Sequence, residues 1–152
     1  MRISHGNTAV SRASSEIHSD DMDRAIEASV VPRPRSNKMN LHILNREFIV
    51  DGVGDIQDPR GMVGAKLEVV NLIVEAFEPS VRNLEKCIKM AGGTVGGMVF
   101  SPLSSAKSVL TDNQLELGVV LIDIGGSTTG IAVYEEGKLL HTKVFKVGAN
   151  YI

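Results

Sequence analysis

The residues best suited to chemistry lie in one short segment, residues 123–129 (Asp-Ile-Gly-Gly-Ser-Thr-Thr). Two adjacent glycines let the main chain turn tightly and approach a ligand with no Cβ in the way. Successive main-chain amides in such a turn form a concavity that binds anions, and hydroxyl groups add further donors. The candidate phosphate-binding residues are therefore Gly125, Gly126, Ser127, Thr128 and Thr129.

Asp123 is the candidate metal residue. It follows a run of apolar residues that delivers the acid to the end of a strand. A carboxylate beside bound phosphates suits Mg²⁺, which keeps several waters and takes few protein ligands. We therefore expect Asp123 to reach magnesium through a water. In the alternative interpretation, the glycines only permit a tight turn and Asp123 hydrogen-bonds the turn amides.

Strands and turns must position this segment. Apolar residues predict strands at Leu117–Ile124, Ile131–Tyr134 and Leu139–Val147, and Glu136-Gly137 predicts a hairpin turn. A strand, a glycine-rich turn and a returning strand form an antiparallel ribbon. This order differs from the strand, loop and helix of a P-loop or a dinucleotide-binding motif.

The upstream part predicts helices alternating with extended segments. Helices are expected at Ser19–Val30, Pro79–Ala91 and Ser101–Leu110, and extended segments at 3–10, 40–50, 55–62, 65–76 and 98–100. Ser19 is expected to cap the first helix, which Pro32 and Pro34 should end. Cys87 lies near the apolar stripe of the second helix, so it is interpreted as a small core residue.

Composition excludes several classes of function. Sixteen Lys+Arg and eighteen Asp+Glu give a net charge of -2, without the basic face of a nucleic-acid binder. Arg33, Arg35 and Lys38 are interrupted by prolines and are interpreted as a solvated connector. Cys87 is the only cysteine, and the four histidines are too scattered for a zinc site. No apolar run reaches the roughly 20 residues of a membrane span, and no secretory signal is present. We expect a cytoplasmic protein that reaches a membrane only through a partner or a segment outside this chain.

Residues 120–133 resemble the second phosphate-binding motif of the actin-like ATPase superfamily, which includes actin, heat-shock ATPase chaperones and sugar kinases. Further segments resemble, in the same order, the FtsA family of bacterial cell-division proteins. These segments are 16–24, 48–52, 58–62, 84–92, 102–106 and 141–150. The resemblance covers nearly all of the chain, and an ordered series is far more specific than a lone phosphate motif.

The resemblance implies an α/β chain with part of the actin-like, ribonuclease-H-like fold and the small lateral α+β subdomain typical of FtsA. Residues 1–98 would form this lateral interaction subdomain, and residues 99–152 would begin the second large subdomain. The turn after Asp123 would then contact the β- and γ-phosphates of ATP, with Asp123 near Mg²⁺. Gly148 falls where the family has a glycine pair near the nucleotide.

The function implied by the resemblance is that of a cell-division scaffold. Such a protein binds ATP, polymerises and links the FtsZ ring to the inner face of the cytoplasmic membrane at the division site. Its partners would be FtsZ, copies of itself and later division proteins, the last through residues 1–98. It would be at most a weak ATPase, and no catalytic residue is assigned. Because the first phosphate loop and the adenosine pocket are absent, we expect a central fragment that is inactive and does not bind ATP tightly.

The motif departs from the family at three positions. Ser127 stands where a third glycine is usual, Gly130 where a second acid is usual, and Ala149 where the second glycine of the downstream pair is usual. The missing carboxylate at Gly130 bears on magnesium handling and hydrolysis. Three alternatives therefore remain open: a sugar-kinase-type phosphotransferase, a pilus-assembly ATPase of the same fold, and an interaction module without nucleotide.

Overall fold

A computed structural model describes residues 1–10, 14–30 and 37–151 of the chain. The predicted helix end at Pro32 and Pro34, and Arg33 and Arg35 of the basic cluster, lie outside the described residues. The chain divides into two compact units, Arg2–Leu84 and Glu85–Ile152. Each unit is described by itself below.

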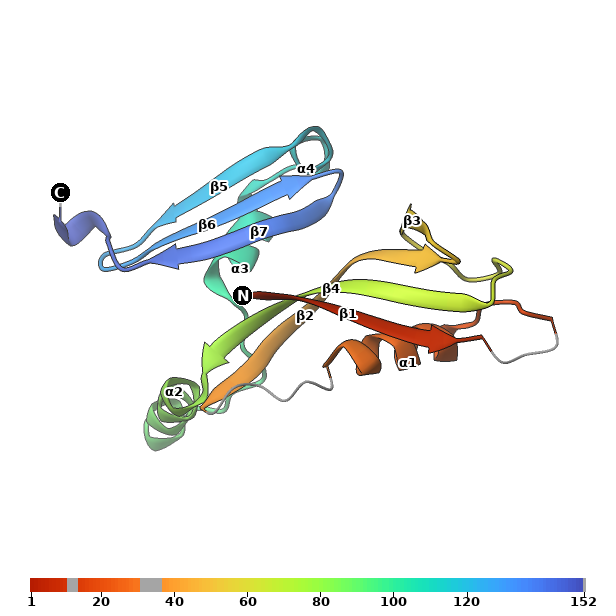
Figure 1. Ribbon diagram of the computed structural model, residues 1–152. Helices are drawn as coiled ribbons and strands as arrows, with labels where there is room; N and C mark the ends of the chain where they lie inside the picture. The colour runs from red at the N-terminus through yellow and green to blue at the C-terminus, as the bar shows by residue number, and fades with distance from the viewer. Residues whose placement is uncertain (11–13, 31–36, 152) are drawn as a thin grey trace. The chain divides into compact units, whose positions relative to one another are not determined.

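The first unit is a four-stranded antiparallel sheet with a helix on one face (Figure 1). The strands lie in the order β1-β4-β2-β3. The elements are β1 (Arg2–Ala9), α1 (Ser19–Val30), β2 (Lys38–Val50), β3 (Val53–Ile56) and β4 (Lys66–Phe77). The predicted strands and first helix of this region are thereby confirmed. Residues 57–62 form a loop without strand structure, so only the start of the expected extended segment 55–62 is a strand.

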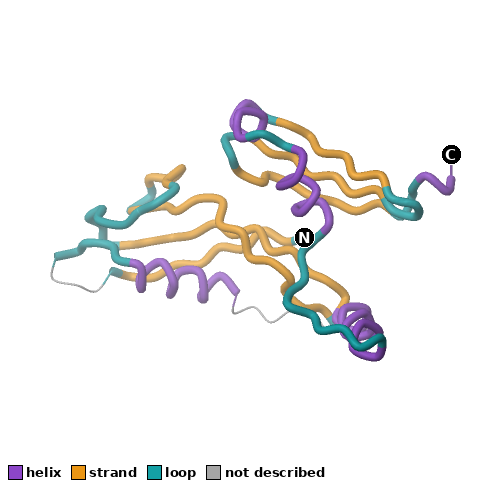
Figure 2. Tube along the Cα trace, turned by 180° about the vertical axis from the view of Figure 1, so that it is seen from behind, coloured by secondary structure: helices purple, strands orange, loops and turns teal. Residues whose placement is uncertain are grey.

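The core of the first unit forms between β4 and α1. A continuous apolar sequence is typical of a strand buried in the middle of a sheet, and β4 lies between β1 and β2. Leu67 and Val69 of β4 are fully buried and belong to one cluster with Ala25 of α1 and Phe48 of β2. Figure 2, which views the molecule from behind, shows α1 running along the sheet.

The contact between α1 and the sheet is unusually close at Gly6 of β1. A Cβ at this position would lie 2.0 Å from the Ala25 carbonyl oxygen and 2.6 Å from the Ser29 nitrogen. Polar side chains join the same elements: Asn71 Nδ2 donates to Ser29 Oγ at 2.6 Å, and Ser4 Oγ donates to the Ser29 carbonyl at 2.5 Å. The helix therefore rests directly on the main chain of β1.

Asp21, rather than Ser19, provides the side-chain hydrogen bond at the start of α1. The Asp21 carboxylate accepts a hydrogen bond from the His18 main-chain N–H at 2.9 Å and pairs with Arg24. The helix already includes Ser19, so the prediction that Ser19 is the cap was wrong. Asp21 is fully buried, and an acid in the first turn also interacts favourably with the helix dipole.

The second unit is a three-stranded antiparallel sheet, β5-β6-β7, with short helices. Helix α2 (Glu78–Met90) spans the division between the two units. The elements that follow it are α3 (Ser101–Val109), α4 (Asp112–Leu117), β5 (Val119–Ile124), β6 (Thr129–Glu135), β7 (Lys138–Phe145) and a 3₁₀ turn at Ala149–Tyr151. Glu136 and Gly137 adopt φ values of 50° and 71°, which confirms the predicted hairpin turn between β6 and β7.

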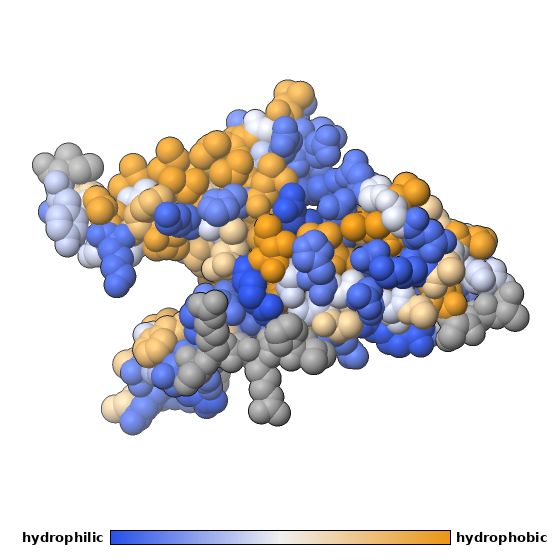
Figure 3. All heavy atoms as spheres, in the orientation of Figure 1, coloured by the Kyte–Doolittle hydropathy of each residue, from blue (hydrophilic) through white to orange (hydrophobic). Residues whose placement is uncertain are grey.

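The two faces of this sheet differ in exposure. Leu121 and Ala132 are buried on the face that α3 contacts through its own buried Pro102 and Ala106. Val120, Ile122 and Ile124, which alternate with the buried or half-buried positions of β5, are more than half exposed. Figure 3 shows apolar side chains gathered over these strands.

Two expectations for the second unit and α2 were wrong, and one helix was missed. Residues 98–100 form no strand among the described residues. Helix α4 was not predicted, although Thr111 and Gln114 form a capping box at its start. Cys87 is exposed, and α2 has no buried residue, so Cys87 is not a core residue in this structure. No described helix combines the length and apolar character needed to cross a membrane.

Candidate functional site: the glycine bend after strand β5

The bend between β5 and β6 leaves its amides exposed. The Gly125 N–H donates to the Thr128 carbonyl at 2.8 Å, which closes the turn. Within the described part of the chain, the main-chain N–H groups of Gly126, Ser127 and Thr128 donate no hydrogen bond, and all three residues are exposed. Adjacent unengaged amides are the feature that an anion-binding turn requires.

The segment after β7 supports the bend from its carbonyl side. The Ala149 N–H donates to the Gly125 carbonyl and the Asn150 N–H to the Gly126 carbonyl, both at 2.9 Å. Gly148 is buried at this contact, where an added Cβ would lie 2.4 Å from the Gly125 oxygen. The structure therefore brings Gly148 against Gly125 and Gly126, and its contact with a nucleotide stays a prediction.

The three hydroxyl groups of the bend differ in their surroundings. Thr129 Oγ1 donates to the Val147 carbonyl at 2.7 Å, so this hydroxyl ties the start of β6 to the segment before Gly148. Ser127 and Thr128 are exposed, and their hydroxyls form no hydrogen bond within the described residues. Phosphate binding by all five residues of the bend stays a prediction, and Ser127 and Thr128 have the more accessible hydroxyls.

Asp123 is held by helix α3. Its Oδ2 atom accepts hydrogen bonds from Ser101 Oγ at 2.7 Å and from Ser105 Oγ at 3.0 Å. These two bonds, that from Ser101 first, lower the pKa of Asp123 below its ordinary value, because they stabilise the ionised carboxylate. The alternative in which Asp123 hydrogen-bonds the turn amides is therefore not what the structure contains.

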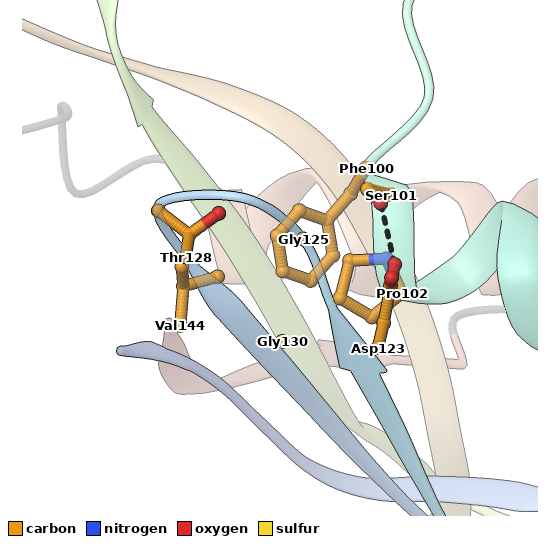
Figure 4. Close-up of a pocket in the computed structure, with 8 residues that line it drawn as sticks. All are labelled: Phe100, Ser101, Pro102, Asp123, Gly125, Thr128, Gly130 and Val144. Atoms are coloured by element: carbon orange, nitrogen blue, oxygen red, sulfur yellow. Dashed lines mark hydrogen bonds between the residues drawn. The ribbon is translucent and has the colours of Figure 1, made fainter. Parts of the chain in front are cut away.

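A pocket of about 160 Å³ lies between the bend and the start of α3 (Figure 4). It is lined by Phe100, Ser101, Pro102, Asp123, Gly125, Thr128, Gly130 and Val144. Figure 4 shows Asp123 of β5 and Ser101 of α3 facing each other beside the bend that carries Thr128. Pockets for whole small molecules measure about 300–1,000 Å³. This pocket is too small for an entire nucleotide.

Gly130 forms part of the wall of this pocket. A Cβ at this position would lie 2.6 Å from Cγ of Pro102. The buried ring of Pro102 therefore occupies the space that a side chain at Gly130 would need. An acidic side chain at this position would have to displace the start of α3. Packing against Pro102 therefore explains why this chain has glycine here instead of an acid.

Sequence reasoning missed the residues that hold the site in place. Ser101 and Ser105 lie four positions apart on α3, so both hydroxyls face the same side of the helix. The predicted helix already places both hydroxyls on one side, but their partner Asp123 is 18 to 22 residues away in the sequence. The pairing with Asp123 could therefore not be predicted from local spacing. The amides of Ala149 and Asn150 could not be found from residue type, because any amino acid except proline supplies them.

Comparison with known proteins gives consistent results over the whole chain. Residues 1–75 match the family described as the SHS2 domain inserted in FtsA. The chain is 34% identical over 149 residues to cell division protein FtsA of Pseudomonas aeruginosa, covering 98% of this chain and 35% of that protein. It is 34% identical over 152 residues to cell division protein FtsA of Bacillus subtilis, covering 100% of this chain and 34% of that protein.

A third relative, cell division protein FtsA of Neisseria meningitidis serogroup B, is 38% identical over 138 residues, covering 90% of this chain and 33% of that protein. The chain spans about a third of the length of these relatives. The matched domain and the antiparallel sheets define a mixed α/β protein of the SHS2-containing class.

The resemblance found in the sequence is confirmed: the chain belongs to the FtsA family. The matched domain ends at residue 75, and the two compact units divide between Leu84 and Glu85. The expected functional boundary at residue 98 stays a prediction.

Proposed function

We propose that this chain belongs to an ATP-dependent cell-division scaffold of the actin-like fold. One observation carries the proposal: three adjacent bend amides without a partner in the described chain lie next to an ionised Asp123 and the close contact of Gly148. The FtsA relatives support the role in division. Residues 1–75 match an SHS2 domain, which supports the lateral interaction subdomain.

In this proposal the bend binds the β- and γ-phosphates of ATP. The amides of Gly126, Ser127 and Thr128 donate to phosphate oxygens, and the exposed hydroxyls of Ser127 and Thr128 add donors. Bound magnesium supplies the positive charge that offsets the phosphates. Asp123 contacts a water of that ion; no cluster of three acids, histidines or cysteines that could hold a metal occurs in the described residues. A carboxylate that shares the ion with waters and phosphates fits the preference of Mg²⁺.

Hydrolysis in such a site is slow. A general base works best when its pKa lies near the operating pH, and the pKa of Asp123 is lowered. Gly130 offers no second carboxylate in the pocket. We therefore propose that ATP binding controls assembly, with turnover only resetting it.

The proposed partners follow from the family and not from this chain alone. They are FtsZ, further copies of the same protein in a filament, and later division proteins that contact residues 1–98. Membrane attachment at the inner face of the cytoplasmic membrane would use a segment outside these residues. The rest of the nucleotide site would come from the remainder of a protein of the relatives' length.

The proposal is tested with the complete protein, fluorescent ATP, magnesium and lipid vesicles. We expect ATP-dependent recruitment of labelled FtsZ to the vesicles. Gly126→Val adds a β-branched side chain to the bend, where its Cβ would lie 3.6 Å from Asn150 Nδ2. Because a β-branched residue restricts the main chain that presents the amides, this change should weaken ATP binding about 10-fold, the loss of roughly one charge-assisted hydrogen bond. The control is Ser104→Ala, whose hydroxyl donates only to the Ser101 carbonyl. Equal FtsZ recruitment with and without ATP would contradict the proposal.

A further inference from the structure

The two hydrogen bonds to the Asp123 carboxylate end on the same oxygen atom. Both Ser101 and Ser105 donate to Oδ2, at 2.7 Å and 3.0 Å. Oδ1 accepts no hydrogen bond from the described residues. One oxygen is therefore fixed by two donors, while the other is available beside the pocket that Asp123 lines.

The two donors come from a helix that is anchored on the sheet. Pro102 and Ala106 of α3 are buried, and Pro102 lies against Gly130 of β6. Ser101 and Ser105 are one helical turn apart, so both hydroxyls project from the same side of α3. A carboxylate bound by two donors on a packed helix loses the rotation about its side-chain bonds that it would otherwise have.

The position of this carboxylate matters to the neighbouring bend. Asp123 is separated by only one residue from Gly125, where the turn begins. A freely rotating Asp123 would be able to accept from the bend amides, and a carboxylate there would compete with a phosphate for the same N–H groups. The serine hydroxyls keep Oδ2 on the helix side instead.

We propose that Ser101 and Ser105 are positioning residues that hold Asp123 so that Oδ1 faces the water shell of nucleotide-bound magnesium. This inference rests on the proposed function, since it concerns the same site. Residues that orient a metal-binding group typically change metal affinity by 10- to 100-fold when they are removed. The magnesium dependence of ATP binding, rather than turnover, is therefore the informative measurement.

The test uses the complete protein and titrates magnesium at a fixed concentration of fluorescent ATP. The Ser101→Ala/Ser105→Ala variant should need about 10-fold more magnesium for half-maximal binding. Its binding of ATP in excess EDTA should not weaken. Ser101→Thr with Ser105 intact keeps both hydroxyl donors and should retain the wild-type magnesium dependence. Ser101→Ala alone, at the exposed start of α3, provides a milder variant if the double variant does not fold.

The matched control is Ser104→Ala/Ser108→Ala on the same helix. These hydroxyls donate to main-chain carbonyls of α3 and do not reach Asp123. An unchanged magnesium requirement in the Ser101/Ser105 variants, or an equal shift in the control, would overturn the inference while leaving the proposed function standing. Absence of magnesium-dependent ATP binding by the wild type would instead overturn the proposed function, and the inference with it.

Discussion

At the scale of single residues, Gly148 has the most exacting position near the candidate site. It lies where the segment after β7 touches the bend, and a Cβ would come within 2.4 Å of the Gly125 carbonyl oxygen. Main-chain atoms cannot move aside as a flexible side chain can. We expect Gly148→Ala to separate the two segments, to break the Ala149 and Asn150 hydrogen bonds, and to lower the free energy of unfolding by about 1–3 kcal/mol.

This prediction is measured by chemical denaturation and by amide hydrogen exchange at Ala149 and Asn150. Gly96→Ala is the control, because a Cβ at Gly96 meets no atom within 4 Å. If Gly148→Ala leaves the exchange rates and the unfolding midpoint at the control's values, the close contact described above is wrong.

Asp58 provides a prediction about pH. Hydrogen bonds from the Arg60 side chain lower the pKa of Asp58 from 3.8 to about 2. Because the folded pKa lies below the unfolded one, the stabilisation is complete above about pH 4 and is lost as the pH falls through about 2. Arg60→Ala should raise the pKa of Asp58 toward 3.8, measured by NMR titration of the carboxyl carbon. Arg82→Ala, whose partner is Glu78, should leave that titration unchanged.

At the scale of elements, the contact between β1 and α1 makes a clear prediction. Gly6 allows α1 to lie on the strand, since a Cβ would come within 2.0 Å of the Ala25 carbonyl oxygen. Gly6→Ala should push the helix away from the sheet and destabilise the first unit by about 1–3 kcal/mol or more. Thermal or urea unfolding measures this, with Gly97→Ala as the control at an open position. An unchanged midpoint for Gly6→Ala would mean that the helix does not approach β1 this closely.

Most elements were predictable because their signals are local. The apolar residues of β4, the acids at the start of α1 and the Glu136-Gly137 turn each determine structure within a few residues of themselves. The errors arose where the outcome depends on distant partners. Residues 98–100 have the composition of a strand but pair with no strand among the described residues, and the apolar stripe of α2 is at most half-buried there.

The candidate site likewise combines residues that local sequence patterns predict with residues that they do not. The bend residues and Asp123 could be found from the sequence, because glycines, hydroxyls and an acid after an apolar strand are a local pattern. The support for Asp123 from Ser101 and Ser105 depends on how α3 packs against β5 and β6, which no local pattern encodes. The effect of Gly130 on magnesium handling and hydrolysis stays a prediction, and its contact with Pro102 adds a packing role that the sequence did not indicate.

At the scale of the whole molecule, the small pocket limits what these residues can bind on their own. The volume of about 160 Å³ is too small for an entire nucleotide. We expect the isolated 152-residue chain to show no saturable binding of ATP at micromolar concentrations, while the complete protein binds it. Isothermal titration calorimetry with ATP and magnesium, at matched protein concentrations, compares the two. Low-micromolar binding by the 152-residue chain would contradict this expectation.

The hydrogen bonds from residues 149 and 150 to the bend also have a practical consequence for dissecting the protein. A polypeptide that ends at Val147 would keep strands β5, β6 and β7. It would lose the Ala149 and Asn150 N–H groups that donate to the turn between β5 and β6. Its bend would sample many shapes, and a negative binding result from it would say nothing about the native loop. Truncation boundaries should therefore fall beyond Tyr151.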